Sequence, residues 1–189
     1  MNAPAGPDYV WAPGGADCRL RKEPVAGVVW HWTAGQGAPD AVVRTLQHRG
    51  LSIHYVIGYD GALKRCADPA TTVCYHAGSR ANGRLVGIEI VNPAVAVNVS
   101  SKFPRDTVAA RAHGRPFVAL DFTPAQYATI VALADELSER FGIPRVTAPG
   151  YDVIDVRKFA GHCEHIHVSK RKIDCGGLVM RWLRSHGYG

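Results

Sequence analysis

Runs of apolar residues along the chain predict several buried β-strands. Val25–Trp32 is nearly continuous in apolar residues and rich in β-branched ones, which is typical of a buried central strand. Leu85–Val91 predicts a second buried strand, and its Ile-Glu-Ile centre carries one acid, Glu89. Ile53–Gly58 predicts a third strand. The Tyr-Asp-Gly turn that follows it would return the chain through Ala62–Cys66 as a hairpin.

Apolar positions at helical spacing predict three helices. The clearest begins after Thr123, which would be the N-cap, with Gln126 completing a capping box and Gly142 ending the helix. A second helix is expected from Pro39 to Arg49, with an apolar face formed by valines and a leucine. The third is expected at Leu178–Ser185 near the end of the chain.

The order of these elements predicts the fold class. Strands alternate with helices around one hairpin, so we expect a single α/β domain with a mixed central β-sheet flanked by α-helices. This domain would span residues 25–189, whereas residues 1–24, rich in Pro, Gly and Ala, would form an extended N-terminal arm. Residues 93–121 lack a clear period and are expected to be a long surface insertion.

Composition and charge limit the classes of partner. A chain of 189 residues that is 47% hydrophobic can bury an ordinary core, and no apolar run reaches the ~20 residues of a transmembrane helix. The N-terminus lacks the basic and apolar regions of a secretory signal, so we expect a protein made in the cytoplasm, without stable membrane insertion. The net charge of +6 favours anionic partners, but no nucleic-acid-binding motif is present.

The five cysteines leave at least one unpaired within a monomer. Cys66 and Cys74 could pair, as could Cys163 and Cys175. The absence of a signal favours buried free thiols in a reducing compartment.

Metal-binding side chains are densest in the segment 161–176, GHCEHIHVSKRKIDCG. It contains histidines, cysteines and carboxylates, which are the ligands of divalent metal ions. His31 ends the first predicted strand and is followed by a Thr-Ala-Gly break, where ligands collect in α/β sheets. An isolated histidine between two tryptophans could also be a core residue.

Five motifs in order resemble the zinc-dependent N-acetylmuramoyl-L-alanine amidases, the type 2 amidase and peptidoglycan recognition protein family. They are HWTAG, SIHYVIGYDG, YHAG, VGIEIVN, and GH followed by RKIDCG, and they extend from about residue 25 to residue 176. The resemblance implies a mixed sheet with Zn²⁺ in a surface cleft. It also implies peptidoglycan as the substrate, cleaved at the amide between N-acetylmuramic acid and the L-alanine of the stem peptide.

By position in these motifs, the resemblance implies that His31, His162 and Asp174 bind zinc. Two imidazoles and one carboxylate would leave a position open for water, as in catalytic zinc sites. The interval from His162 to Asp174 is longer than is typical of the family, so His165 or His167 could replace His162. Cys175 stands where the family usually has proline, and its role as a ligand is a minority alternative.

The resemblance also implies the catalytic and substrate-binding residues. Glu89 matches the general base of one branch, whereas the tyrosine that another branch uses is replaced by Ile53; Tyr55 is nearby but one position out of phase, on another face of a strand. Lys172 matches the residue that stabilises the oxyanion. His76 would line the substrate cleft, and Asn82 would either join it or simply form a turn. His54 is expected to be structural.

The small, basic, single-domain chain most resembles the phage endolysins in this family. We therefore expect a monomeric lytic enzyme, made in the host cytoplasm, that acts on the cell wall after release. A cytoplasmic amidase that recycles soluble muropeptides is an alternative. A non-catalytic peptidoglycan-binding module is another, although such members lose a zinc ligand, and a closed structural zinc site lacks CxxC spacing here.

Overall fold

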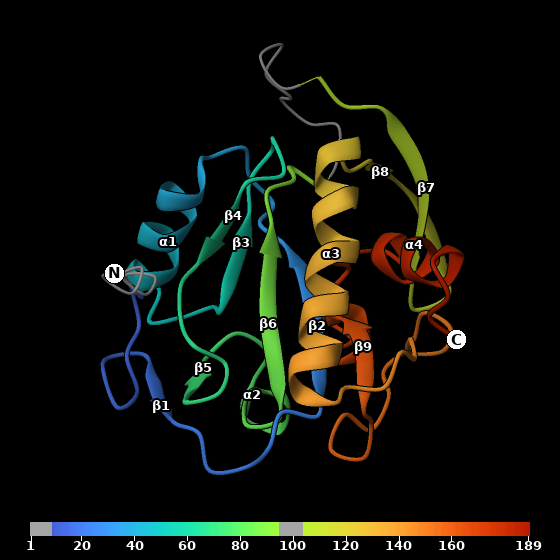
Figure 1. The fold of residues 1–189 in the computed structure, drawn as a ribbon. Coiled ribbons are helices and arrows are strands. Elements are labelled where there is room, and N and C mark those ends of the chain that lie inside the picture. The colour runs from blue at the N-terminus through green and yellow to red at the C-terminus, as the bar shows by residue number, and fades with distance from the viewer. Residues whose placement is uncertain (1–8, 95–103) are drawn as a thin grey trace, which may run out of the picture.

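A mixed β-sheet organises the chain in the computed structural model, which describes residues 9–94 and 104–189 (Figure 1). Within these residues, five strands form the sheet in the order β4-β3-β6-β2-β9. In chain order, they are β2 (Gly27–Trp32), β3 (Tyr55–Ile57), β4 (Leu63–Arg65), β6 (Leu85–Ile90) and β9 (Gly161–Glu164).

The strand directions make the sheet mixed. β2 is parallel to both of its neighbours, β6 and β9, and β3 is parallel to β6. β4 is antiparallel to β3, as expected for the predicted hairpin. The predicted α/β class with a mixed central sheet is therefore confirmed.

Helices cover the sheet. The three longer ones are α1 (Pro39–His48), α3 (Pro124–Phe141) and α4 (Leu178–Ser185), and the short ones are α2 (Ser79–Asn82) and the 3₁₀ turn η1 (His165–His167). α3 runs along one face of the sheet, with α4 beside it (Figure 1). The three long helices lie where the apolar spacing predicts them.

The start of α3 joins this helix to the carboxyl ends of two strands. The Thr123 hydroxyl accepts a hydrogen bond from the Gln126 amide, and the Gln126 side chain accepts one from the Thr123 amide, completing the predicted capping box. The buried Gln126 side chain also donates to the Gly58 and Val91 carbonyls. Gly142 ends the helix in the left-handed conformation at φ 64°, which favours glycine.

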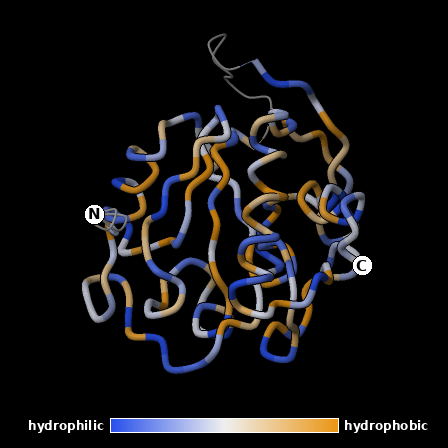
Figure 2. The backbone as a smooth tube through the Cα atoms, viewed as in Figure 1, coloured by the Kyte–Doolittle hydropathy of each residue, from blue (hydrophilic) through white to orange (hydrophobic). Residues whose placement is uncertain are grey.

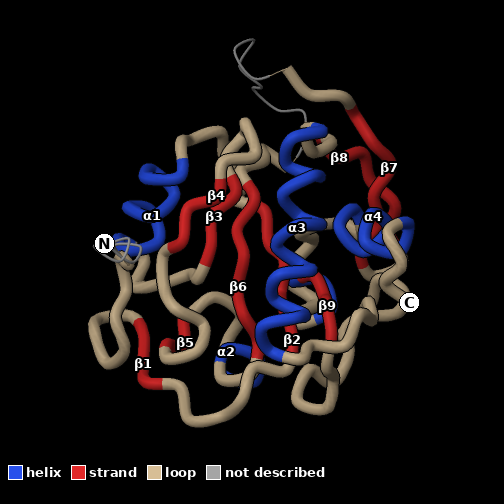
Figure 3. Tube along the Cα trace, in the orientation of Figure 1, coloured by secondary structure: helices blue, strands red, loops and turns tan. Residues whose placement is uncertain are grey.

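The predicted surface insertion contains a regular β-hairpin (Figure 3). β7 (Thr107–Ala112) pairs antiparallel with β8 (Arg115–Leu120) through a turn at His113 and Gly114, both with positive φ. The sequence did not predict this hairpin, because the inward positions of β7 are alanines and give little hydrophobic alternation. Residues 95–103 of the predicted insertion lie outside the described residues.

Residues preceding β2 also contact the domain. β1 (Cys18–Leu20) pairs with β5 (Thr72–Cys74), and Trp11 is buried. The first eight residues of the predicted arm lie outside the described residues, and the boundary at residue 25 stays a prediction. All five cysteines lie in the described part of the chain and are free thiols.

The main core lies between the sheet and α3. Trp30 of β2 and Ile88 of β6 pack against Ile130, Leu133 and Leu137 of α3. Figure 2 shows the hydrophobic colour concentrated along the central strands and the hydrophilic colour along outer loops. Among the described residues, no helix has the length and apolar character that crossing a membrane requires.

Candidate metal centre and catalytic cleft

The register of two parallel strands brings the first candidate ligand next to the candidate base. His31 on β2 is the direct partner of Glu89 on β6. Because side chains alternate along a strand, both residues leave the face that carries Trp30 and Ile88 and is covered by α3. His31 and Glu89 therefore share the opposite face of the sheet, where the cleft lies.

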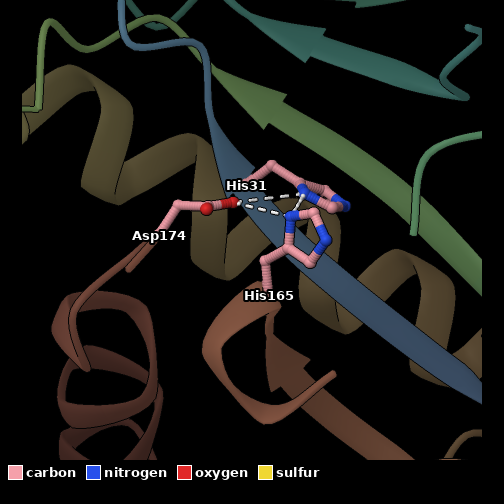
Figure 4. A group of neighbouring side chains, drawn as sticks. All are labelled: His31, His165 and Asp174. Carbon is pink, nitrogen blue, oxygen red and sulfur yellow. Dashed lines mark hydrogen bonds and ion pairs between the residues drawn. The ribbon is translucent and has the colours of Figure 1, made fainter. Parts of the chain in front are cut away.

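Three side chains from separate segments converge in this cleft (Figure 4). The Nδ1 atoms of His31 and His165 are 2.9 Å apart. Asp174 Oδ2 is 3.0 Å from Nδ1 of His165 and 3.3 Å from Nδ1 of His31. All three residues are buried, and they form the one group of three or more potential metal ligands found in residues 9–94 and 104–189.

The donor set fits zinc in both chemistry and spacing. Zinc–nitrogen bonds of about 2.0–2.1 Å in a tetrahedral arrangement separate neighbouring ligand atoms by about 3.3 Å. The three separations here, 2.9, 3.0 and 3.3 Å, are close to this value. Three protein ligands also leave the fourth tetrahedral position open, as in catalytic zinc sites.

The structure corrects the choice of the second histidine. His162 pairs with Val28 in the β9–β2 register, so its side chain lies on the core face of the sheet, away from His31. There it stacks on Trp30 and lies 3.1 Å from the Ser138 hydroxyl of α3. His165, one of the two alternatives, stands with His31 and Asp174 instead.

His167 and Cys175, the other ligand alternatives, are also outside the cluster. His167 accepts a hydrogen bond from the Glu164 amide and donates one to the Gly150 carbonyl. Cys175 is buried in the main core, and burial raises its thiol pKa. The contacts of both residues are those of structural residues.

The side chain of His76 orients the ring of His31. Its Nε2 lies 3.0 Å from Nδ1 of His76, and Nε2 of His76 lies 3.4 Å from the Leu85 carbonyl. His76 donates its Nε2 proton to this carbonyl and accepts the Nε2 proton of His31. The Nδ1 lone pair of His31 is then directed at the cluster. Gly87 makes room for the arrangement, because a Cβ there would lie 2.6 Å from the His76 ring.

The two predicted substrate-binding residues occupy different places. His76 lines the cleft. Asn82 does not line it; its side-chain oxygen accepts hydrogen bonds from the His76 and Ala77 amides at 3.3 and 2.8 Å. Asn82 therefore holds the turn that carries His76, the second of the two roles considered for it.

Electrostatics favour ligand-competent forms of the cluster. Burial and the neighbouring His165 lower the pKa of His31 to about 4, so its imidazole is neutral at pH 7. Burial opposes ionisation of Asp174, but the adjacent His165 and His31 side chains outweigh it and hold the pKa of Asp174 below its usual range. A neutral imidazole and a carboxylate are the forms that bind metal.

Glu89 has the surroundings of a proton acceptor. Burial, followed by the charge of Asp174, raises its pKa to about 8, while Lys172 and Arg49 act in the opposite direction. One of its oxygens, Oε2, is buried without a hydrogen-bond partner among the described residues. A carboxyl group with a pKa near neutral, beside three potential metal ligands, suits general base catalysis.

Lys172 completes the polar lining of a cleft of about 550 Å³. Its side chain is exposed, and its backbone carbonyl accepts a hydrogen bond of 3.0 Å from His113 at the tip of the β7–β8 hairpin. A hollow of about 260 Å³ beside α1 shares Glu89 and Arg49 with the cleft and extends it.

Two further predictions concern β3 and the segment before it. Tyr55 pairs with Ile88 and joins the main core, so its side chain lies on the opposite face of the sheet from Glu89. His54, preceding β3, accepts a hydrogen bond from the Gly87 amide and lies 3.1 Å from the Thr72 carbonyl. It thus has the surroundings of a structural residue.

Sequence reasoning missed Glu164, which follows Cys163 on β9. Its buried carboxylate accepts hydrogen bonds from the Gly177, Val179 and Met180 amides at 2.6, 2.8 and 3.2 Å. Burial raises its pKa to about 7, although these three bonds act against the increase. Glu164 thereby ties the start of α4, and the loop carrying Asp174, to the strand that precedes His165. The acidic residue within the sequence GHCEH was the feature that could have indicated this role.

Fold and site together define an α/β protein with a His-His-Asp group that could hold a metal ion and a carboxyl group in register with the first histidine. Residues 21–177 match the profile of the N-acetylmuramoyl-L-alanine amidase family, and the chain belongs to this family. A comparison with curated proteins finds no match.

Solved structures with the same fold include amidases of several sources. The N-acetylmuramoyl-L-alanine amidase LysCS of Clostridium intestinale, an endolysin, is 19% identical with a TM-score of 0.59, and the match covers 95% of each chain. The Ph2119 endolysin of a Thermus scotoductus bacteriophage is 19% identical with a TM-score of 0.55, covering 90% of each chain.

The third structure is a complex of Escherichia coli AmiD with anhydro-N-acetylmuramic acid-L-Ala-D-γ-Glu-L-Lys. It is 21% identical with a TM-score of 0.58, covering 87% of this chain. The present chain spans 58% of the length of AmiD.

Proposed function

We propose that the protein is a zinc-dependent N-acetylmuramoyl-L-alanine amidase that cleaves peptidoglycan between the lactyl group of N-acetylmuramic acid and L-alanine. The observation that carries this proposal is the convergence of His31, His165 and Asp174 beside Glu89 in one cleft. Family membership supports the choice of bond. The related AmiD structure contains a muropeptide of this chemistry.

His31 and His165, through Nδ1, and Asp174, through Oδ2, would hold the zinc ion. When bound, zinc supplies a Lewis acid that polarises the scissile carbonyl and lowers the pKa of water to roughly 7. His76 keeps the His31 ring in the tautomer that presents Nδ1. Glu164 holds the loop of Asp174 in place through the start of α4.

Glu89 carries out the proton transfers. As a carboxylate, it accepts a proton from the attacking water and later returns it to the leaving amine of L-alanine. Its raised pKa of about 8 makes the protonated form available for the second step at neutral pH. The exposed ammonium group of Lys172 reaches the cleft and stabilises the negative charge that develops on the carbonyl oxygen.

The biological role we propose is lytic and endolysin-like: a monomer made in the host cytoplasm that acts on the cell wall after release. The net charge of +6 supports attraction to an anionic polymer rather than to a small soluble fragment. The fold similarity to two endolysin structures over at least 90% of both chains points in the same direction. We propose no nucleic-acid partner and no stable membrane insertion.

Digestion of purified wall sacculi tests the bond that is cleaved. Mass spectrometry should find new L-alanine amines and intact glycan chains. New reducing sugar ends would identify a glycosidase instead and contradict the proposal.

A parallel assay on soluble anhydromuropeptide separates the possible roles. Faster release from sacculi than from the soluble fragment supports the lytic role, whereas the reverse order supports muropeptide recycling. Muropeptide binding without zinc and without hydrolysis would identify a binding module.

A further inference from the structure

A cluster of arginines surrounds a second hollow, remote from the cleft. This hollow, about 430 Å³ in volume, is lined by four arginines with Glu23 and Ser79 among the other residues. We call these arginines the basic patch, and they are Arg19, Arg80, Arg84 and Arg157. They come from four segments: β1, α2, the residue preceding β6, and the loop before β9.

The basic patch lies at the opposite end of the sheet from the catalytic residues. Arg84 precedes the first residue of β6, whereas Glu89 is near its end. Five residues of strand separate the two by about 16 Å. Figure 1 shows α2 beside the start of β6. None of the residues that line the cleft also lines this hollow.

Positive charge in the basic patch is only partly neutralised within the described residues. Arg157 forms an ion pair of 3.0 Å with Asp155, and Glu23 is the one acid in the lining. No ion pair to Arg19, Arg80 or Arg84 is found in the described part of the chain. The Nε atom of Arg84 is buried without a hydrogen-bond partner there.

A fifth guanidinium group lies behind the basic patch. Arg21 donates hydrogen bonds to the Pro69, Gly83 and Thr72 carbonyls at 2.6, 2.7 and 3.2 Å. Its pKa is lowered, chiefly by burial, and the charge of Arg19 acts in the same direction. Like charges gathered in this way destabilise the folded chain unless an anion offsets them.

We infer that the basic patch binds the phosphate groups of an anionic phosphodiester polymer of the cell wall. Arginine is suited to phosphate because its planar guanidinium group donates two parallel hydrogen bonds. Guanidinium groups from four segments around one hollow can contact successive phosphates of a chain. The cell wall as the source of the polymer rests on the proposed function.

Binding at this site would keep the enzyme on the wall while the cleft remains free. The two sites lie at opposite ends of the sheet, so an attached polymer does not block the catalytic residues. Attachment raises the local concentration of the cleft near its substrate. We therefore expect attachment to increase the rate of hydrolysis of intact walls but not of soluble muropeptides.

Binding measurements with the full chain test this inference. The probe is a poly(glycerol phosphate) oligomer of defined length, titrated by isothermal calorimetry at fixed salt. The variant Arg19→Gln/Arg80→Gln removes two exposed arginines of the basic patch, and Arg84→Gln tests the unpartnered Nε. We expect the double variant to bind the oligomer about tenfold more weakly or worse.

A matched control separates the site from overall charge. Arg44→Gln/Arg111→Gln removes two exposed arginines elsewhere, so both double variants have a formal net charge of +4 instead of +6. We expect the control to bind within about threefold of the wild type, since only distant charge is lost. Equal losses in the two double variants, or no loss in the basic-patch variant, would overturn the inference.

Competing polyanions and enzyme assays complete the test. Tighter binding of a DNA duplex or of phosphatidylglycerol vesicles than of the oligomer would also overturn it. Hydrolysis of soluble muropeptide should be the same in all variants. Hydrolysis of intact walls by the basic-patch variant should fall to the rate seen on walls stripped of phosphate polymer. If no variant hydrolyses anything but the oligomer still binds at the basic patch, the proposed function fails and this inference stands.

Discussion

At the scale of single residues, the site depends on which side chains reach the face of the sheet that carries His31. His165 reaches it from the η1 turn, with its Nδ1 2.9 Å from that of His31. His162 faces the core, where it contacts Trp30 and Ser138. The two histidines, three positions apart, should therefore respond differently to substitution.

His165→Ala should lose zinc, and His162→Ala should keep it. We expect the His165 variant to bind zinc more than about 100-fold more weakly, since loss of an outer partner of a ligand already costs 10–100-fold. His162→Ala leaves a cavity and should lower the free energy of unfolding by roughly 2–3 kcal/mol. Elemental analysis and urea denaturation measure the two effects. Stoichiometric zinc in the His165 variant would contradict the assignment.

Glu89→Gln should separate metal binding from catalysis. Glutamine keeps the shape of the side chain but cannot take up the proton, so kcat should fall about 10²–10⁴-fold. Zinc content should stay at the wild-type level, because Glu89 is not one of the three clustered ligands. Steady-state kinetics on a muropeptide and elemental analysis provide the check. Wild-type turnover would remove Glu89 from the base role.

The same substitution should change how stability depends on pH in chelator-treated protein. An unfolded Glu89 releases its proton near pH 4.5, whereas the folded chain keeps it until about pH 8. Between these values the folded state binds more protons, so this group makes the wild type less stable as pH rises. The advantage of Glu89→Gln over the wild type should grow from pH 5 to pH 8 by about 1 kcal/mol or more. Urea titrations with EDTA test this; a constant difference would count against it.

Sequence reasoning placed His31, Asp174, Glu89 and Lys172 in one cleft, where the structure also has them, because each belongs to a recognisable strand or motif. It chose His162 over His165, although the side chain of His162 takes the core face of β9 and His165 lies in the η1 turn that follows. That face is set by pairing with β2, about 130 positions earlier in the chain, which no local pattern reveals. Glu164 was missed for the same reason, since its partners are amides of α4.

At the scale of elements, Gln126 connects α3 to the sheet. Its side chain accepts from Thr123 and donates to the carbonyls of Gly58 and Val91, which follow β3 and β6. These contacts fix the position of α3 along the direction of the strands. One buried amide group thus positions a helix of 18 residues.

Gln126→Ala should therefore destabilise the fold far more than an ordinary glutamine substitution. It leaves two buried carbonyls without this donor, and we expect a loss of roughly 2–4 kcal/mol in the free energy of unfolding. Gln47→Ala, on the exposed face of α1, is the matched control and should change it by less than about 0.5 kcal/mol. Thermal and urea denaturation compare them; equal effects would refute the connecting role.

Prediction of elements succeeded where local signals were strong. α3 has a capping box and a terminating glycine, and α4 spans the predicted residues. The β7–β8 hairpin was missed because small residues weaken its alternation, and β9 because four residues are too few to show a period. Short strands of this kind form because neighbouring strands supply their hydrogen bonds.

At the scale of the whole molecule, the three clustered ligands join distant parts of the chain. His31 belongs to a central strand, His165 to the turn after an edge strand, and Asp174 to the loop before the last helix. An ion bound by all three stabilises the folded state only, because the unfolded chain does not hold them together.

Removal of metal should therefore lower the thermal stability of the whole chain. A metal at about 100 times its Kd contributes about 2.7 kcal/mol, so chelation should lower Tm by about 5–10 °C. Added zinc should restore it. His165→Ala serves as the control, since its Tm should not respond to chelator. An unchanged wild-type Tm would show that the ion and the fold are not coupled.

The pairing of His31 with Glu89 has a mechanical consequence. Backbone hydrogen bonds between β2 and β6 hold the two residues at a fixed spacing, so thermal fluctuations of the sheet displace them together. Asp174 and Lys172 lie on a loop and can fluctuate relative to this pair. The backbone hydrogen bonds of the sheet thus fix the spacing of His31 and Glu89, and a one-residue insertion in β6 before Glu89 would turn its side chain towards the core.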